Sequence, residues 1–184
     1  MDIIHELEIE TTPEKLFEAL STDKGISAWW TKAKTQAKVG GINEFAFRNG
    51  AVATFRVEKL EPGKAVAWSA DQVPPDWNGT QVLFELISGK KGGPVTLRFG
   101  HTGFKTMTPL VAFSSYAWAQ YLRSLKLFLE TGTGEPFGSR LPSPPERRRA
   151  GIETLARQGS DHDKGHFGKP RVGSRSAARS RQHS

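Results

Sequence analysis

The stretch TMTPLVAFSSYAWAQYLRSLKLFLET, residues 106–131, decides how the rest of this 184-residue chain is arranged. Its apolar residues recur three and four positions apart, the spacing that gathers side chains on one face of an α-helix. The face consists of Leu110, Ser114, Ala117 or Trp118, Tyr121 or Leu122, Leu125, and Phe128 or Leu129. Because so broad an apolar face needs a surface to cover, the sequence predicts a sheet packed against this long helix.

The N-terminal part reads as one strand followed by two short helices. Residues 3–10 alternate between apolar and polar, as in a half-buried strand, and this alternation places His5 on the inner side. Thr12 and Pro13 suit the cap and the first turn of a helix. Two helices are therefore expected between this strand and residue 31.

The second short helix is predicted to begin with Asp23 as its cap and to carry Trp29 and Trp30. Of these two tryptophans, one is expected to face inward and the other to pack outside. Their ring faces are good stacking surfaces for a flat ligand at the entrance of a pocket, although packing is the commoner role.

Alternation with a period of two predicts six further strands before the long helix. The short links at Gly40-Gly41, Asn49-Gly50 and Pro62-Gly63 are tight turns, so consecutive strands must pair antiparallel. Segment 72–79 is predicted to be an exposed loop. The strands are expected at residues 31–37, 42–48, 51–61, 64–71, 80–88 and 94–102. The expected fold class is α+β, with a seven-stranded antiparallel sheet and three helices.

Strand parity gives this sheet one solvated face, with Glu44, Arg48, Arg56 and Arg98, and one unusually aromatic face. Large aromatic side chains under a helix either fill the space or line a cavity. For a single aromatic residue, core packing is the commoner role. The candidate ligand-binding residues are Trp29, Trp30, Phe45, Phe47, Phe55, Trp68, Phe84, Leu97, Phe99, His101, Trp118, Tyr121 and Leu125.

Several segments, in their order and spacing, resemble a known family. They are ISAWW at 26–30, VGG at 39–41, FAF at 45–47, ATFRVEKLEPGKAVAWSA at 53–70, LRFGHTGF at 97–104 and WAQYLRSLKLFLETG at 118–132. Together they resemble the SRPBCC (START-like, helix-grip) superfamily, in the branch of homologues of the activator of the 90-kDa heat-shock protein ATPase. The resemblance covers residues 1 to about 137.

The resemblance implies a curved sheet wrapped around the long C-terminal helix, with a deep hydrophobic cavity between them. Members of this superfamily include lipid and polyketide carriers, cyclases, antibiotic-sequestering proteins and co-chaperone domains, so the fold does not fix the function.

Residues 138–184 differ in composition from the predicted helix-grip domain, residues 1–137. The domain holds 15 basic and 15 acidic residues, whereas the segment after it holds 11 basic and 4 acidic residues and carries the whole net charge of +7. Its Pro, Arg, Gly and Ser content predicts a disordered basic tail. Since the domain itself is neutral, no specific nucleic-acid partner is expected.

Candidates for chemistry are few. His101 follows the inward residues of the last strand and is either a general base or hydrogen-bond partner for a ligand, or a histidine bonded to nearby backbone, which is the favoured reading. The hydroxyl of Tyr121 is a possible polar contact. The chain has no cysteine and no serine elbow. His162 and His166 have a metal-like spacing without a third ligand, so no metal, cofactor or catalytic set is predicted.

The sequence thus predicts a non-catalytic module that binds an apolar or aromatic small molecule. One alternative is a co-chaperone-like domain that stimulates a chaperone ATPase, and another is a cyclase or hydrolase that uses His101 and Tyr121. No signal peptide or membrane-length apolar run is evident, so a cytoplasmic monomer or homodimer without membrane insertion is expected.

Overall fold

The structure is a computed structural model that describes residues 1–47 and 50–139, except for the side chain of Lys91. The predictions for Arg48, for His162 and His166, and for disorder of the tail beyond residue 139 lie outside the described residues.

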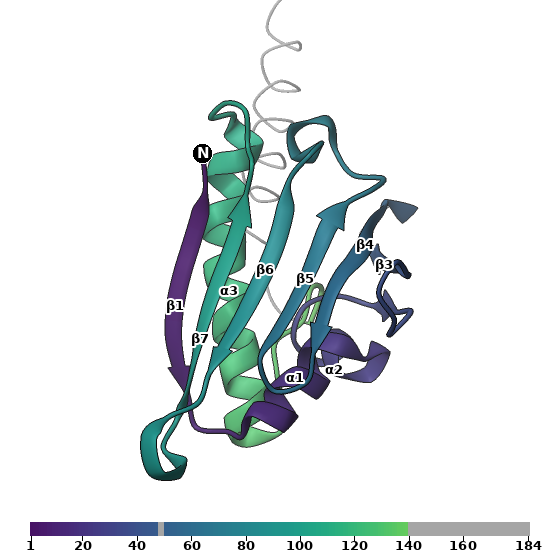
Figure 1. Cartoon of the computed structure of the whole chain (residues 1–184). Coiled ribbons are helices and arrows are strands. Elements are labelled where there is room, and N and C mark those ends of the chain that lie inside the picture. Colours follow the sequence, from purple (N-terminus) through teal and green to yellow (C-terminus); the bar gives the residue numbers. More distant parts are fainter. Residues whose placement is uncertain (48–49, 140–184) are drawn as a thin grey trace, which may run out of the picture. The chain divides into compact units, whose positions relative to one another are not determined.

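Seven antiparallel strands form one curved sheet in the order β1-β7-β6-β5-β4-β3-β2 (Figure 1). The first strand pairs with the last, with Ile3 opposite His101. The strands are β1 (Ile3–Ile9), β2 (Ala33–Lys34), β3 (Ile42–Ala46), β4 (Val52–Glu61), β5 (Ala65–Ala70), β6 (Gln81–Ile87) and β7 (Val95–Thr102). The structure confirms the predicted α+β class and the seven-stranded antiparallel sheet.

Strand β2 is much shorter than the predicted strand at 31–37. Only Ala33 and Lys34 pair with β3. Before β2, the Ala46 N–H still donates to the Lys32 carbonyl at 2.9 Å, and the Thr31 hydroxyl donates to the carbonyl of Ala46. After β2, a side chain takes over, because the Gln36 N–H donates to Oδ1 of Asn43 at 3.1 Å. The alternating polarity of residues 31–37 predicts an extended chain, but it does not predict which of their backbone groups pair with β3.

The helices are α1 (Pro13–Ser21), α2 (Asp23–Trp29) and α3 (Pro109–Thr131), and two short 3₁₀ turns, η2 (Pro75–Trp77) and η3 (Lys90–Gly92), lie in the loops. Thr12 caps α1 as predicted, by accepting from the N–H of Lys15. The prediction that Asp23 caps α2 is wrong, because Thr22 accepts from the N–H of Gly25. The Asp23 carboxylate instead accepts from the backbone and the hydroxyl of Thr35.

Helix α3 has well-defined ends. The Thr108 hydroxyl accepts from the N–H of Val111 at 3.2 Å and Pro109 fills the first turn. Gly132 ends the helix in the left-handed conformation, with φ of 82°, which glycine adopts without steric cost. The helix thus begins three residues after the start of the quoted stretch and ends with it.

Helix α3 runs along one face of the sheet, and α1 and α2 cover the same face near one end (Figure 1). Two bonds tie the C-terminal half of α3 to β1 and the residue after it: Lys126 Nζ donates to the Glu8 carbonyl at 2.7 Å, and the Glu10 N–H donates to the Glu130 carboxylate at 3.0 Å. A register shift between Val57 and Lys59 in β4 marks a bulge, which increases local twist. The sheet therefore grips α3, and the core lies between them.

Candidate functional site: an aromatic cluster between the sheet and α3

The predicted site residues come together in one hydrophobic cluster. His101 is fully buried within it, and Phe47 and Tyr121 are half-buried against it. The other predicted residues are all buried in this cluster: Trp29, Trp30, Phe45, Phe55, Trp68, Phe84, Leu97, Phe99, Trp118 and Leu125. The structure thus brings the whole predicted set together, while its contact with a ligand stays a prediction.

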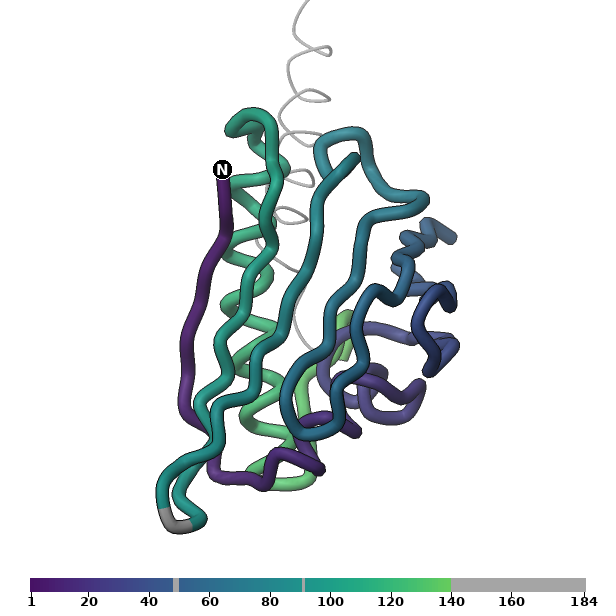
Figure 2. The backbone as a smooth tube through the Cα atoms, in the orientation of Figure 1, coloured from purple at the N-terminus to yellow at the C-terminus, as the bar shows by residue number. Residues whose placement is uncertain are grey.

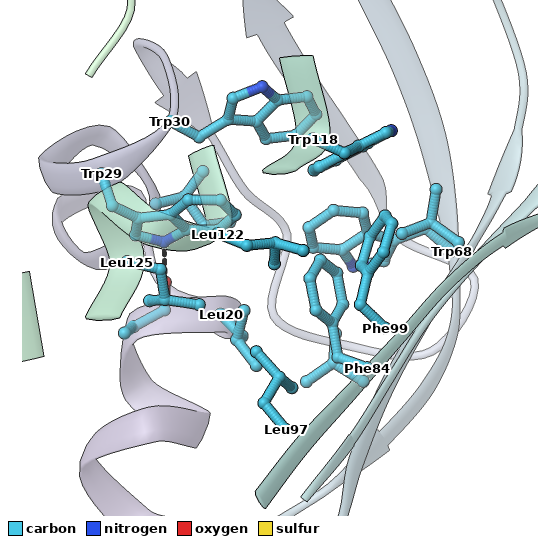
Figure 3. Close-up of a cluster of buried hydrophobic side chains, with 14 of the residues drawn as sticks. Leu20, Trp29, Trp30, Trp68, Phe84, Leu97, Phe99, Trp118, Leu122 and Leu125 are labelled. Carbon is cyan, nitrogen blue, oxygen red and sulfur yellow. Dashed lines mark hydrogen bonds between the residues drawn. The ribbon is translucent and has the colours of Figure 1, made fainter. Parts of the chain in front are cut away.

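Trp30 contacts aromatic rings from the sheet and from α3, and Figure 3 shows it next to Trp118. Its ring centroid is 4.5 Å from that of Phe45 on β3 and 4.9 Å from that of Trp118 on α3. Its plane is parallel, within 6°, to that of Trp68 on β5, at a centroid distance of 6.2 Å. Three indoles, from the residue after α2, from the sheet and from the long helix, therefore meet in the interior.

Both Trp29 and Trp30 face inward, with 0% and 2% of their surfaces exposed, so the prediction that one packs outside is wrong. Helix α2 ends at Trp29, and Trp30 has left helical geometry, with φ of −111° and ψ of −83°. Successive side chains within a helix point in different directions. Because Trp30 lies outside the helix, this rule does not separate it from Trp29, and both rings can face the core. Trp29 also donates its indole N–H to the carbonyl of Ala19 on α1 at 2.9 Å.

His101 is held by a chain of side-chain hydrogen bonds. The indole N–H of Trp118 donates to its Nδ1 at 3.1 Å, and its Nε2 lies 2.9 Å from Oγ1 of Thr80. The Thr80 hydroxyl already donates to the carbonyl of Trp77 at 2.7 Å, so Oγ1 accepts from the Nε2–H of His101. These bonds fix one neutral tautomer and occupy both ring nitrogens.

Burial lowers the pKa of His101 from 6.5 to about 4. Protonation would place a second N–H at Nδ1 against the indole donor of Trp118, so it opposes the hydrogen bonds as well. The partners are the side chains of Thr80 and Trp118, rather than the nearby backbone expected from the sequence. His101 is therefore a neutral, fully bonded group that joins β7, the loop before β6, and α3.

Trp77 is a site residue that the sequence prediction missed. It lies in η2, within the segment predicted to be an exposed loop, yet it is only half-exposed. Its indole N–H donates to Oγ of Ser114 on α3 at 3.2 Å, and its ring packs edge-on against His101 at 5.2 Å. The sequence did contain one indication of this contact: a large apolar ring among prolines and polar residues favours a loop that folds back onto the domain.

Residues 133–139, here called the strap, fold back from the end of α3 toward α2 (Figure 2). The Phe137 N–H donates to the Trp30 carbonyl at 2.6 Å, and the Phe137 ring packs edge-on against Phe47 at 5.6 Å. The Glu135 N–H donates to Oγ of Ser124 at 2.6 Å. The strap thus packs against the backbone of Trp30 and the ring of Phe47.

Few polar atoms of the cluster are left without a partner. Among residues 1–47 and 50–139, the buried side-chain atoms with no hydrogen bond are Nε1 of Trp68, Nε2 of His5 and Oγ1 of Thr11. His5 is inward, as predicted, and its ring stacks on Phe99 at 6.2 Å. The cluster offers ring faces and the unpaired indole donor of Trp68, an arrangement suited to holding a flat apolar molecule.

Within the described part of the chain, no group of three His, Asp or Glu side chains could hold a metal ion. In the same residues, no helix is both long and apolar enough to cross a bilayer.

A curved antiparallel sheet that grips a C-terminal helix, with two short helices after its first strand, defines the helix-grip class of SRPBCC proteins. The sequence profile described as "Activator of Hsp90 ATPase homolog 1-like protein" matches residues 10–130. The chain belongs to this family, which confirms the resemblance found in the sequence.

Solved structures support the assignment. The Aha1 dimer of Colwellia psychrerythraea, determined in solution, is 37% identical over 73% of this chain and 99% of that one, with a TM-score of 0.65. A crystal structure of a Mesorhizobium loti protein is 25% identical over 70% and 96%, with a TM-score of 0.62. DynU16, from the dynemicin biosynthetic locus, is 20% identical over 76% and 49%, with a TM-score of 0.62, and shows the fold alone. A comparison with curated protein sequences gives no match.

Proposed function

We propose that this protein binds an apolar or aromatic small molecule between its sheet and α3, without changing it chemically. The observation that carries the proposal is the meeting of three indoles: Trp30 directly after α2, Trp68 on β5 and Trp118 on α3. Aromatic rings from converging elements are the commonest lining for flat apolar ligands. The strap over Trp30 is the segment that would move to admit one.

The state of His101 favours binding over catalysis. A general base needs a free lone pair within reach of the substrate. In His101 the Nδ1 lone pair accepts from Trp118, and Nε2–H is donated to Thr80. The geometry therefore supports the binding role better than the cyclase or hydrolase alternative.

The proposal is tested by recording the melting temperature of the protein with a panel of fatty acids, flat aromatic hydrocarbons and polycyclic aromatic ketones. A ligand at 100 times its Kd stabilises the folded state by about 2.7 kcal/mol, which raises the melting temperature by several degrees. Native mass spectrometry of the freshly purified protein would detect a ligand carried from the cell.

Trp30→Leu serves as the matched variant, because it removes the ring that contacts both Trp68 and Trp118 and keeps an apolar side chain. Ligands that stabilise the natural protein should stabilise this variant much less. If no compound in the panel changes the melting temperature, and no co-purified mass is found, the proposal is wrong. An equal response of the folded Trp30→Leu variant would place the ligand elsewhere.

A second candidate function rests on the comparisons. The family description names an activator of the Hsp90 ATPase, and the Colwellia psychrerythraea relative is an Aha1 that forms a dimer. The second candidate is therefore a cytoplasmic homodimer that stimulates a chaperone ATPase through its surface. Titrating the protein into an Hsp90 ATPase assay tests the activity, and sedimentation velocity tests the dimer. An unchanged ATPase rate at saturating protein would reject this candidate.

A further inference from the structure

Trp68 occupies the middle of the gripped face, on β5, the fourth of the seven strands in the sheet. Its side chain is 1% exposed. Aromatic rings surround it: Phe45 at 5.3 Å, Phe84 at 5.1 Å in an edge-on arrangement, and Trp30 parallel to it at 6.2 Å. Its indole N–H, a donor that is always protonated, has no acceptor in this environment.

Three other buried or half-buried indoles of this protein do have acceptors. Trp29 donates to the carbonyl of Ala19, Trp77 to Oγ of Ser114, and Trp118 to Nδ1 of His101. Leaving a buried donor unpaired costs free energy, and buried donors in folded proteins are nearly always paired. The unpaired N–H of Trp68 is therefore an exception that a ligand oxygen would remove.

The surroundings also restrict the charge of such a ligand. Among the described residues, the buried polar side chains are Ser21, Thr31, Asn43, Thr80, His101, Ser114 and Ser124. None of them is a lysine or an arginine, and His101 is kept neutral by burial. Because an unpaired buried charge is costly, a carboxylate or phosphate would not be accommodated beside Trp68.

We propose, building on the binding function above, that the indole N–H of Trp68 donates a hydrogen bond to a neutral oxygen of the bound molecule. The ligand class is then a flat aromatic compound with a carbonyl oxygen, such as a polycyclic aromatic ketone, rather than a hydrocarbon or a fatty acid. Trp30, parallel to Trp68, supplies a ring face for the same molecule.

The test compares 9-fluorenone with fluorene, which share a flat tricyclic shape and differ by the carbonyl oxygen. Binding of each is measured by isothermal titration to the full chain and to the variants Trp68→Phe and Tyr116→Phe. A net hydrogen bond of ordinary strength predicts that the natural protein binds the ketone about fivefold more tightly. Trp68→Phe should lose this preference, whereas Tyr116→Phe, which removes a hydroxyl from an exposed ring, should keep it.

Indole ¹H–¹⁵N spectra provide a readout that does not depend on a variant folding. The Trp68 indole proton, assigned in the natural protein, should move downfield on addition of 9-fluorenone and much less on addition of fluorene. Equal affinity for both compounds, or a Trp68 signal that does not respond to the ketone, would overturn this inference and leave the proposed binding function standing. If neither compound binds and the wider panel also fails, the binding function itself is wrong.

Discussion

The indole N–H of Trp118 on α3 donates to Nδ1 of His101 on β7 at 3.1 Å, inside the aromatic cluster. This bond joins the gripped helix to the sheet and, together with Thr80, fixes the histidine as a neutral tautomer. A buried polar network that is fully satisfied makes a core rigid and specific. Changes to the Trp118–His101 hydrogen bond should therefore affect the pH dependence of stability as well as the aromatic cluster.

Stability should fall in acid because of His101. In the folded state its pKa is lowered to about 4, against 6.5 for the unfolded chain, so below pH 6.5 the unfolded chain binds the proton first. The contribution is complete above pH 6.5 and is lost as the pH falls toward 4, amounting to about 3 kcal/mol over that interval. Urea unfolding between pH 7.5 and 4 measures it. The variant His101→Gln should show a shallower pH dependence, and an identical slope would contradict this prediction.

Trp118→Phe should raise the pKa of His101, because protonation of Nδ1 would no longer break a hydrogen bond. The variant should also be less stable by about 1–3 kcal/mol, since the buried Nδ1 is left without a donor. A ¹H–¹⁵N titration of the imidazole checks the pKa. As a control, Tyr116→Phe changes an exposed ring of the same helix and should leave the titration where it is. A pKa unchanged in Trp118→Phe would mean that burial alone sets it.

The strap should contribute to stability. A chain that ends at Gly132 loses the bonds from Phe137 to Trp30 and from Glu135 to Ser124. It should be less stable than a chain that ends at Ser139 by about 1–3 kcal/mol, as expected for two backbone donors and one aromatic contact. Equal melting temperatures for the two truncated chains would show that the strap contributes nothing.

Leu125→Ala should destabilise the protein by about 2–5 kcal/mol, because the side chain is fully buried and its removal leaves a cavity. Leu127→Ala, on the same helix at a half-buried position, is the matched comparison and should cost clearly less. Chemical unfolding of both variants measures the difference. Similar losses at the two positions would indicate that α3 does not use the Leu125 face to cover the sheet.

Several features could be predicted because they depend on local pattern. The period of the 106–131 stretch predicted α3, and alternation predicted which strand residues face inward, Phe45, Trp68 and Phe99 among them. The sequence does not distinguish Trp118 from Ala117, or Leu122 from Tyr121, as the residue on the buried face of the helix. The structure buries Trp118 and Leu122, while Tyr121 is half-buried. Helical period specifies a face only to within about one residue, and packing against the sheet selects the rotation.

The errors concern residues whose position depends on distant partners. The prolines and the Asn-Gly pair around Trp77 predict an exposed loop. In the structure, the hydrogen bond to Ser114 and the ring contact with His101 place Trp77 against the domain. The sequence did not predict the side-chain directions of Trp29 and Trp30, because α2 ends between them, and that end depends on where the chain turns into β2. The composition of a loop or a helix end predicts its local conformation, but not which distant residues it contacts in the folded protein.

Local sequence patterns are enough to predict the order of the elements, the antiparallel pairing that short turns require, and the aromatic character of the inner face. Side-chain periodicity and turn chemistry are local properties, so they can be read without the fold. Two properties depend on the folded arrangement: His101 is a fully bonded neutral group, and Trp68 has an unpaired donor. Hydrogen-bond satisfaction depends on groups brought together from β5, β7, η2 and α3, and their mutual distances exist only once the sheet has closed on the helix.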